Sequence, residues 1–152
     1  MKVDNKIMAQ FQMLGSRIVS INLKNDFLSA NCLDSGKKWL DLSHAIVGID
    51  QQEDNSFLGV IQLHVAVRIK EEKQKYSLKI ILEGGFYAPE EMGKEGFERM
   101  LSINGLAALY GIARAQVRSI SSQVFADGGV LLPMIDVTRY SKILEETSKS
   151  SQ

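Results

Sequence analysis

The sequence predicts an α+β fold, a single domain over residues 1–152 in which a four-stranded antiparallel sheet is followed by its helices. Hydrophobic and polar residues alternate through much of the chain before Pro89, which is typical of strands buried on one face. After Pro89 the hydrophobic spacing becomes helical, so strands and helices are segregated. We expect one long helix packed on one face of the sheet, a short C-terminal helix, and flexible ends at 1–14 and 147–152.

Four segments carry the strand pattern, in residues 19–24, 44–52, 60–70 and 75–85. The third is the clearest, because its hydrophobic residues occupy every second position. Only the short polar stretches EDNS and EEKQ separate the last three segments, and short polar links are typical of antiparallel hairpins. The four segments therefore predict an antiparallel meander.

A long connection, residues 27–43, separates the first two strand segments. Connections of this length are usually functional or mobile. Its hydrophobic residues either form part of a binding surface or simply cover the edge of the sheet. They are Phe27, Leu28, Leu33, Trp39, Leu40 and Leu42.

The helical part opens with residues 93–103, and we expect a break at Asn104 and Gly105 before a long helix from Leu106 to Ile120. That helix is apolar on two sides. Its large side chains form one stripe, which comprises Leu106, Leu109, Tyr110, Ala113, Val117, Ile120 and Val124. Its small or uncharged side chains form an opposite stripe, which comprises Ala108, Gly111, Ile112, Ala115 and Ser119. A solvated helix face normally carries charges, so the second stripe predicts a packing surface.

The segment ADGGVLLPMID, residues 126–136, combines a helix stop at its two glycines with a short extended apolar run. Asp136 or Thr138 can cap a last helix over residues 137–146. Tyr140, Ile143 and Leu144 share one face of that helix.

The bulk composition excludes several classes of partner. Eighteen basic and eighteen acidic residues give no net charge, so no overall field attracts nucleic acid or an anionic membrane. The single cysteine, Cys32, excludes an internal disulfide, and the chain carries neither an export signal nor a run of hydrophobic residues long enough for membrane insertion. We expect a cytoplasmic protein.

Catalytic and cofactor motifs are not found in the sequence. His44 and His64 both fall on predicted strands, without a third ligand to complete a metal site. The glycine pairs at 84–85 and 128–129 lack the spacing of a phosphate-binding loop. We therefore expect neither an enzyme nor a bound metal or cofactor.

Four short motifs, in this order, carry a resemblance to a known family. KKW at 37–39 is similar to the tryptophan-bearing part of the family's long loop, and EGGFYAP at 83–89 is similar to its QGGIF segment. IAR at 112–114 is similar to its YAR, and LLP at 131–133 to its LAP. The chain thus resembles the SecB family of tetrameric export chaperones, from about Arg17 to Tyr140.

The resemblance implies a homotetramer. Family members extend two sheets edge to edge, and two such dimers pack through their long helices. Here that packing would use Ala108, Gly111, Ile112, Ala115 and Ser119, whose small side chains permit a close approach. Alternatively, this face forms a second core layer within one subunit, with the C-terminal helix as its cover.

The resemblance also implies an ATP-independent holdase for unfolded or precursor polypeptides, possessing an apolar peptide groove and no cofactor. The groove would lie between the connection at 27–43 and the last helix. Its residues would be Phe27, Leu28, Leu33, Trp39, Leu40, Leu42, Tyr140, Ile143 and Leu144.

The outer sheet face departs from the family pattern. Typical members dock the SecA motor through carboxylates on this face. Here Asn22 stands where the pattern has an acid, Asp26 retains the next one, and the surrounding residues are mainly basic or neutral. SecA docking through Asn22 and Asp26 is therefore disfavoured, whereas peptide holding is not affected.

Two other functions remain open. The same scaffold would suit a binding module dedicated to one partner, as in the toxin–antitoxin chaperones that resemble SecB. A small-molecule-binding protein or enzyme that uses the groove is the third and weakest interpretation.

Overall fold

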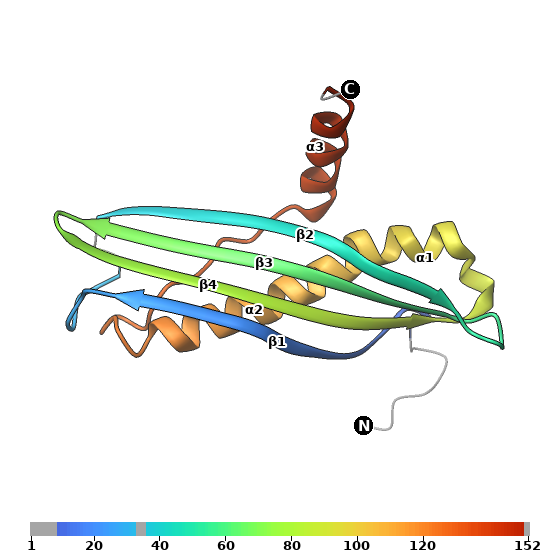
Figure 1. Ribbon diagram of the computed structural model, residues 1–152, viewed down its shortest axis with the longest axis horizontal. Coiled ribbons are helices and arrows are strands. Elements are labelled where there is room, and N and C mark those ends of the chain that lie inside the picture. Colours follow the sequence, from blue (N-terminus) through green and yellow to red (C-terminus); the bar gives the residue numbers. More distant parts are fainter. Residues whose placement is uncertain (1–8, 33–35, 151–152) are drawn as a thin grey trace.

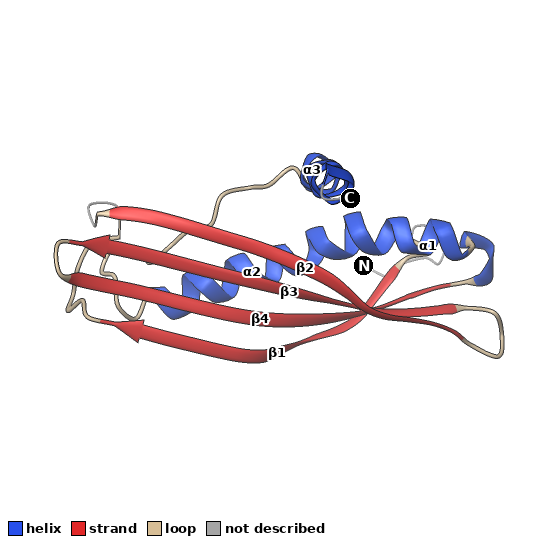
Figure 2. Cartoon of the chain, turned by 45° about the horizontal axis from the view of Figure 1, so that its top comes forward, coloured by secondary structure: helices blue, strands red, loops and turns tan. Residues whose placement is uncertain are grey.

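The computed structural model describes residues 9–32 and 36–150, which form a twisted four-stranded sheet with its helices on one side. Figures 1 and 2 show the long helix behind the sheet and the C-terminal helix projecting past one edge. The predicted α+β class is confirmed. The elements are β1 (Gln12–Asn25), β2 (Lys37–Gln51), β3 (Phe57–Glu71), β4 (Gln74–Ala88), η1 (Glu90–Met92), α1 (Lys94–Met100), the π-helical turn η2 (Leu101–Gly105), α2 (Leu106–Ser121) and α3 (Val137–Ser150).

The strand order is β1-β4-β3-β2, so the predicted simple meander is wrong at its first strand. β2, β3 and β4 are consecutive antiparallel neighbours, as their short links require. β1 instead pairs with β4, three strand spacings or about 14 Å from β2. The connection at residues 26–36 can span about 36 Å when extended, so its length permits this crossing.

β2 begins at Lys37 rather than near His44. Residues 37–43, which were expected to belong to the long connection, pair in register with β3, for example Leu40 with Val67. The pattern was hidden because Trp39 stands at an outward position, which masks the alternation of Leu40 and Leu42.

The expected helix break at Asn104 and Gly105 does not occur. The helical segment runs for 28 residues from Lys94 to Ser121, and the π-helical turn η2 lies within it. Gly105 has helical φ and ψ of −62° and −46°, and a Cβ there would lie 3.4 Å from the Phe86 ring. This glycine therefore lies within a continuous helix, in contact with the sheet, and does not end it.

The core lies between the inner sheet face and α2. The large stripe of α2 is confirmed, since its residues from Leu106 to Val117 are buried, while Ile120 and Val124 are half-buried. These side chains cover the alternating inner residues of β3 and β4, which comprise Ile61, Leu63, Val65, Val67, Ile69, Tyr76, Leu78, Ile80 and Leu82.

α2 ends at Ser121, close to the expected Ile120, but the two glycines do not end it, because they lie in the turn that follows. Gly128 and Gly129 have φ of 97° and 84°. The Oγ of Ser121 donates to the Val117 carbonyl (2.7 Å) and accepts the Val130 amide (2.7 Å), which fixes the direction in which the chain leaves the helix. Asp136 then caps α3, because its Oδ1 accepts the Arg139 amide at 2.9 Å.

Candidate functional site

Four side chains on the inner face of β2 are only partly covered. Leu40, Leu42, His44 and Ile46 lie opposite buried residues of β3, and yet each retains solvent exposure. β2 is an edge strand of the described sheet, and Figure 2 shows α2 running behind the more central strands. The inner face of β2 thus offers an apolar row at the border of the core.

Tyr140 attaches α3 to this row. Its hydroxyl donates to the Leu42 carbonyl at 3.3 Å and lies 3.5 Å from Nδ1 of His44, whose ring centroid is 5.5 Å from the Tyr140 ring. Burial lowers the pKa of His44 and raises the pKa of Tyr140, so both groups favour their neutral forms. The contact joins predicted residues of β2 and α3.

Beyond Tyr140, the apolar side chains of α3 face solvent. Ile143 is 51% exposed and Leu144 is 39% exposed. Together with Leu40, Leu42, Ile46 and Tyr140, they form what we call the β2–α3 surface. Beside it lies a hollow of about 320 Å³, lined by Ile46, Glu95, Glu98, Arg99, Ser102, Ile103, Ser141 and Glu145.

The extended segment 130–136 connects α2 to α3 and is clamped to α2. Tyr110 donates its hydroxyl to the Pro133 carbonyl at 2.7 Å, and Arg114 Nε donates to the Leu132 carbonyl at 2.9 Å. The clamp leaves Leu131 and Met134 exposed. Neither was predicted as a site residue, because Val130, Leu131 and Leu132 form one continuous apolar run, and only the structure separates the exposed Leu131 from its buried neighbours.

The other predicted groove residues are dispersed. Phe27 is buried in the core, with its ring 5.7 Å from that of Phe125, whereas Leu28 is 92% exposed. Trp39 is 42% exposed on the outer sheet face, opposite Arg68 and on the other side from Leu40. Leu33 lies outside the described residues.

A second uncovered apolar surface lies on the helix side. In the small stripe of α2, Ile112 is half-buried, and Ala108, Gly111, Ala115 and Ser119 are exposed. A Cβ added at Gly111 would meet no atom within 4 Å in the described structure. On β1 the inward-facing Ile18, Ile21 and Leu23 also remain exposed, and this strand pairs on one side only within the described sheet.

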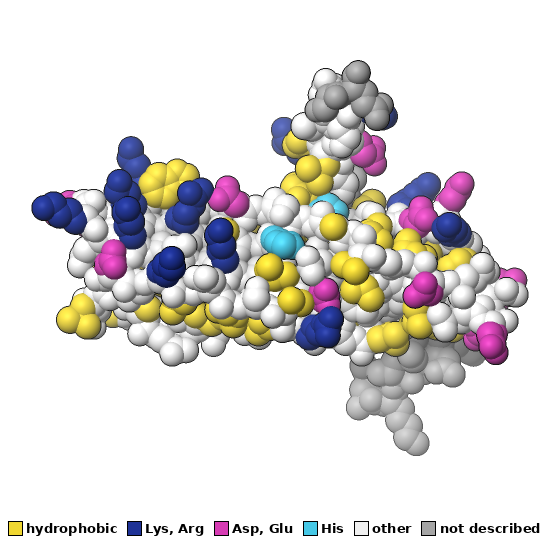
Figure 3. Space-filling view, in the orientation of Figure 1, with side chains coloured by type: hydrophobic (Ala, Val, Ile, Leu, Met, Phe, Trp, Pro, Cys, Tyr) yellow, Lys and Arg dark blue, Asp and Glu magenta, His cyan; other side chains and the backbone are white. Residues whose placement is uncertain are grey.

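Polar contacts cross the middle of the outer sheet face, which is the face turned toward the viewer in Figure 3. Glu83 accepts from Arg17 Nε at 2.8 Å and from Gln62 at 2.9 Å, and these bonds lower the pKa of its carboxyl. Asn22 is exposed, opposite Lys79. Asp26 accepts the Lys75 amide at 3.2 Å through Oδ2, so its carboxylate holds the start of β4.

The two histidines do not come together, because His44 lies on the inner sheet face and His64 on the outer one. Within residues 9–32 and 36–150, no three His, Cys, Asp or Glu side chains form a potential metal site. None of the described helices has both the length and the hydrophobicity to span a membrane.

Comparison with known proteins finds similarity in structure alone. No family model matches the chain, and no curated protein matches it in sequence. A similar solved structure is the Mycobacterium tuberculosis SecB-like chaperone Rv1957 in complex with a ChAD peptide from the Rv1956 HigA1 antitoxin. It has 16% identity and a TM-score of 0.60, over 84% of this chain and 91% of that one. A protein of unknown function from Streptococcus agalactiae aligns at 10% identity and a TM-score of 0.44, over 82% and 97%.

The fold is SecB-like. Its four-stranded antiparallel sheet, long helix and C-terminal helix match those of the Mycobacterium tuberculosis protein. At this level of identity, the likeness establishes the architecture, and the chemistry of this chain's own surfaces must support the function.

Proposed function

We propose that this protein is an ATP-independent holdase that binds unfolded or precursor polypeptides at the β2–α3 surface. The observation that carries the proposal is the exposure of Ile143 and Leu144 on a helix fastened by Tyr140 to an apolar strand. Exposed apolar side chains gathered on one surface mark a binding site. Apolar contact also suits clients of diverse sequence, since it requires no specific hydrogen bonds.

Simple energetics favour several such surfaces in one assembly. Covering about 300 Å² of apolar surface contributes about 7.5 kcal/mol. Association costs about 4 kcal/mol or more in lost translational and rotational freedom. One surface alone would therefore bind a client with roughly millimolar affinity. Linked surfaces that engage one unfolded chain together gain avidity.

A homotetramer would provide these linked surfaces. The small stripe of α2 and the inner face of β1 are apolar and uncovered in the described chain, and the outer edge of β1 is unpaired there. Pairing two β1 edges and packing two dimers through α2 would cover all three features.

A dedicated single-partner module is the second candidate. The Mycobacterium tuberculosis neighbour is bound to a peptide from an antitoxin, which supports a polypeptide ligand on this scaffold. Such a module would bind one protein tightly and protect unrelated clients poorly. We place either activity in the cytoplasm. A role in export, including hand-over to SecA through Asn22 and Asp26, is a weaker extension because lysines surround those residues.

The test is suppression of light scattering by a reduced, aggregating client protein. Replacing Ile143 and Leu144 together by serine should weaken protection, and the fold should persist because both side chains are exposed. Leu131→Ser is the control, since Leu131 is 62% exposed on segment 130–136 and belongs neither to the β2–α3 surface nor to the proposed subunit contacts. Equal protection by the double variant and the parent would refute the site. Protection of a single client among many would favour the dedicated module.

A further inference from the structure

A basic surface occupies one end of the outer sheet face, where β1 and β3 end and β2 and β4 begin. Figure 3 shows it as a group of lysine and arginine side chains around an apolar one. Strand register places seven side chains on this face, namely Lys24, Lys37, Trp39, Arg68, Lys70, Lys75 and Lys79. A chain with no net charge thus concentrates positive charge at one place.

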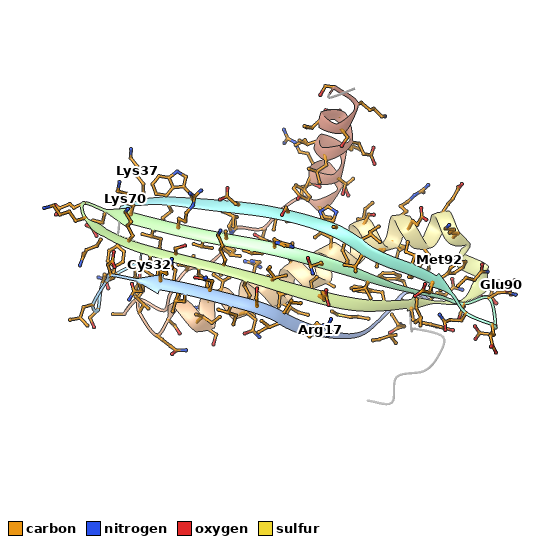
Figure 4. The ribbon with its side chains drawn as sticks, viewed as in Figure 1. Arg17, Cys32, Lys37, Lys70, Glu90 and Met92 are labelled. Carbon is orange, nitrogen blue, oxygen red and sulfur yellow. The ribbon has the colours of Figure 1, made fainter. Side chains whose placement is uncertain are left out.

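The lysine arrangement opposes the stability of the sheet. Lys70 lies directly opposite Lys37 on one side and directly opposite Lys75 on the other, and Figure 4 labels Lys37 and Lys70 at this end of the sheet. Like charges at directly opposed positions destabilise a strand pair. The row of Lys37, Lys70 and Lys75 therefore does not stabilise the folded sheet.

Little of the charge is neutralised within the described chain. Arg68 pairs with Asp41 at 2.8 Å, with both side chains exposed. Among the residues that the structure describes, the five lysines of the surface have no ion pair. The surface is therefore free to contact negative groups of another molecule.

A hollow of about 300 Å³ lies among these cations. It is lined by Trp39, Arg68, Ile69, Lys70, Lys75, Tyr76 and Ser77. Because one wall is the exposed indole, the hollow can accept an apolar side chain while carboxylates on either side contact lysines.

We propose that this basic surface docks an acidic segment of a partner polypeptide, with one apolar side chain of the segment in the hollow beside Trp39. From Lys75 to Lys79 the surface measures about 13 Å along β4, which corresponds to roughly four residues of extended chain. Single-stranded nucleic acid fits less well, because it uses several stacking aromatics along a continuous track. Here Trp39 is the sole tryptophan of the chain, and the next cation along β1 beyond Lys24 is Arg17, which in the described structure is paired with Glu83.

This surface is separate from the proposed holdase site, since Trp39 lies on the opposite face of the sheet from Leu40 and Leu42. Either proposal can therefore fail without the other.

The test is a titration followed by the fluorescence of Trp39, which reports from within the surface. The probe is a decapeptide of Glu and Asp with one central Leu, and its control has Gln and Asn in place of the acids. We expect saturable binding of the acidic peptide alone, weakened by added salt and by changing the central Leu to Ser.

Lys70→Glu gives the sharpest outcome, because stability and binding should change in opposite directions. It turns two repulsive cross-strand pairs into attractive ones, so the Tm should rise by about 1–4 °C while peptide affinity falls roughly tenfold. Lys37→Glu repeats the affinity measurement at the first residue of β2, the edge strand of the described sheet. Lys142→Glu, an exposed change of equal charge on α3, should leave affinity unchanged.

Three results would overturn the proposal. The first is equal binding of the acidic and the amide peptide. The second is unchanged affinity in both Lys70→Glu and Lys37→Glu. The third is tighter binding of a uridine dodecamer, or of phosphatidylglycerol vesicles, than of the acidic peptide.

Discussion

The two glycines after α2 allow a controlled test of how segment 130–136 is positioned. Gly128 and Gly129 share positive φ angles, but their surroundings differ. A Cβ at Gly128 would meet no atom within 4 Å in the described structure. One at Gly129 would lie 2.6 Å from Ser121 Oγ and from the Ser122 amide nitrogen, and 2.8 Å from the Arg118 carbonyl oxygen.

Alanine at Gly128 should cost only the left-handed backbone strain, about 1–2 kcal/mol. Alanine at Gly129 adds the collision with the helix end. Relief of that collision breaks the Ser121–Val130 hydrogen bond and leaves a buried amide unsatisfied, which adds about 1–3 kcal/mol. Gly129→Ala should thus lower the free energy of unfolding by about 2–5 kcal/mol.

The assay is urea unfolding followed by far-ultraviolet circular dichroism, at one fixed protein concentration because assembly would otherwise contribute to the apparent stability. The measured quantity is the difference between the two variants. If Gly128→Ala and Gly129→Ala unfold at the same urea concentration, the hydrogen bond between Ser121 Oγ and the Val130 amide does not hold segment 130–136 in place.

Three further predictions use single substitutions. Tyr110→Phe should lower the free energy of unfolding by about 1 kcal/mol in urea titrations, because the Pro133 carbonyl loses its donor. Burial lowers the pKa of His44, so its contribution to stability is complete above pH 6.5 and is lost as the pH falls through the folded-state pKa. Thermal unfolding of His44→Gln should therefore show a smaller loss of stability between pH 7 and pH 5 than the parent. Ala115→Arg should reduce the solution mass measured by light scattering, whereas Ser148→Arg on α3 should not; an unchanged mass in both would exclude the α2 stripe as an interface.

The elements that sequence predicts best are those in which one face is continuously buried. Buried positions alternate along β3 and β4 because α2 covers their inner faces, and the large residues from Leu106 to Val117 keep a helical period for the same reason. The turn at Gly128 and Gly129 is also predictable from sequence, because positive φ strongly favours glycine.

The incorrectly predicted features depend on partners distant in sequence. The residues of β1 and its flanking segments do not indicate that this strand pairs with β4 rather than with β2. The helix continues through Gly105, which packs against Phe86 on β4, where a Cβ would lie 3.4 Å from the ring. Tertiary contact thus overrides the usual tendency of Asn104 and Gly105 to end a helix.

The candidate site was partly predictable. Leu42 and Tyr140 come together as expected, although the contact also uses His44, which the sequence offers only as a strand histidine. Trp39 was grouped with Leu40, yet strand alternation sends neighbouring side chains to opposite faces once β2 is known to begin at Lys37. Whether the predicted groove residues bind peptide stays a prediction.

The most direct test of the holdase proposal is hydrogen–deuterium exchange with and without a reduced, unfolded client. The proposal predicts slower exchange on client binding in β2 near Leu40 to Ile46 and in α3 from Tyr140 onward, and loss of this protection in the Ile143→Ser, Leu144→Ser variant. Client-dependent protection that is absent from both elements, or that is unchanged in the variant, would contradict it.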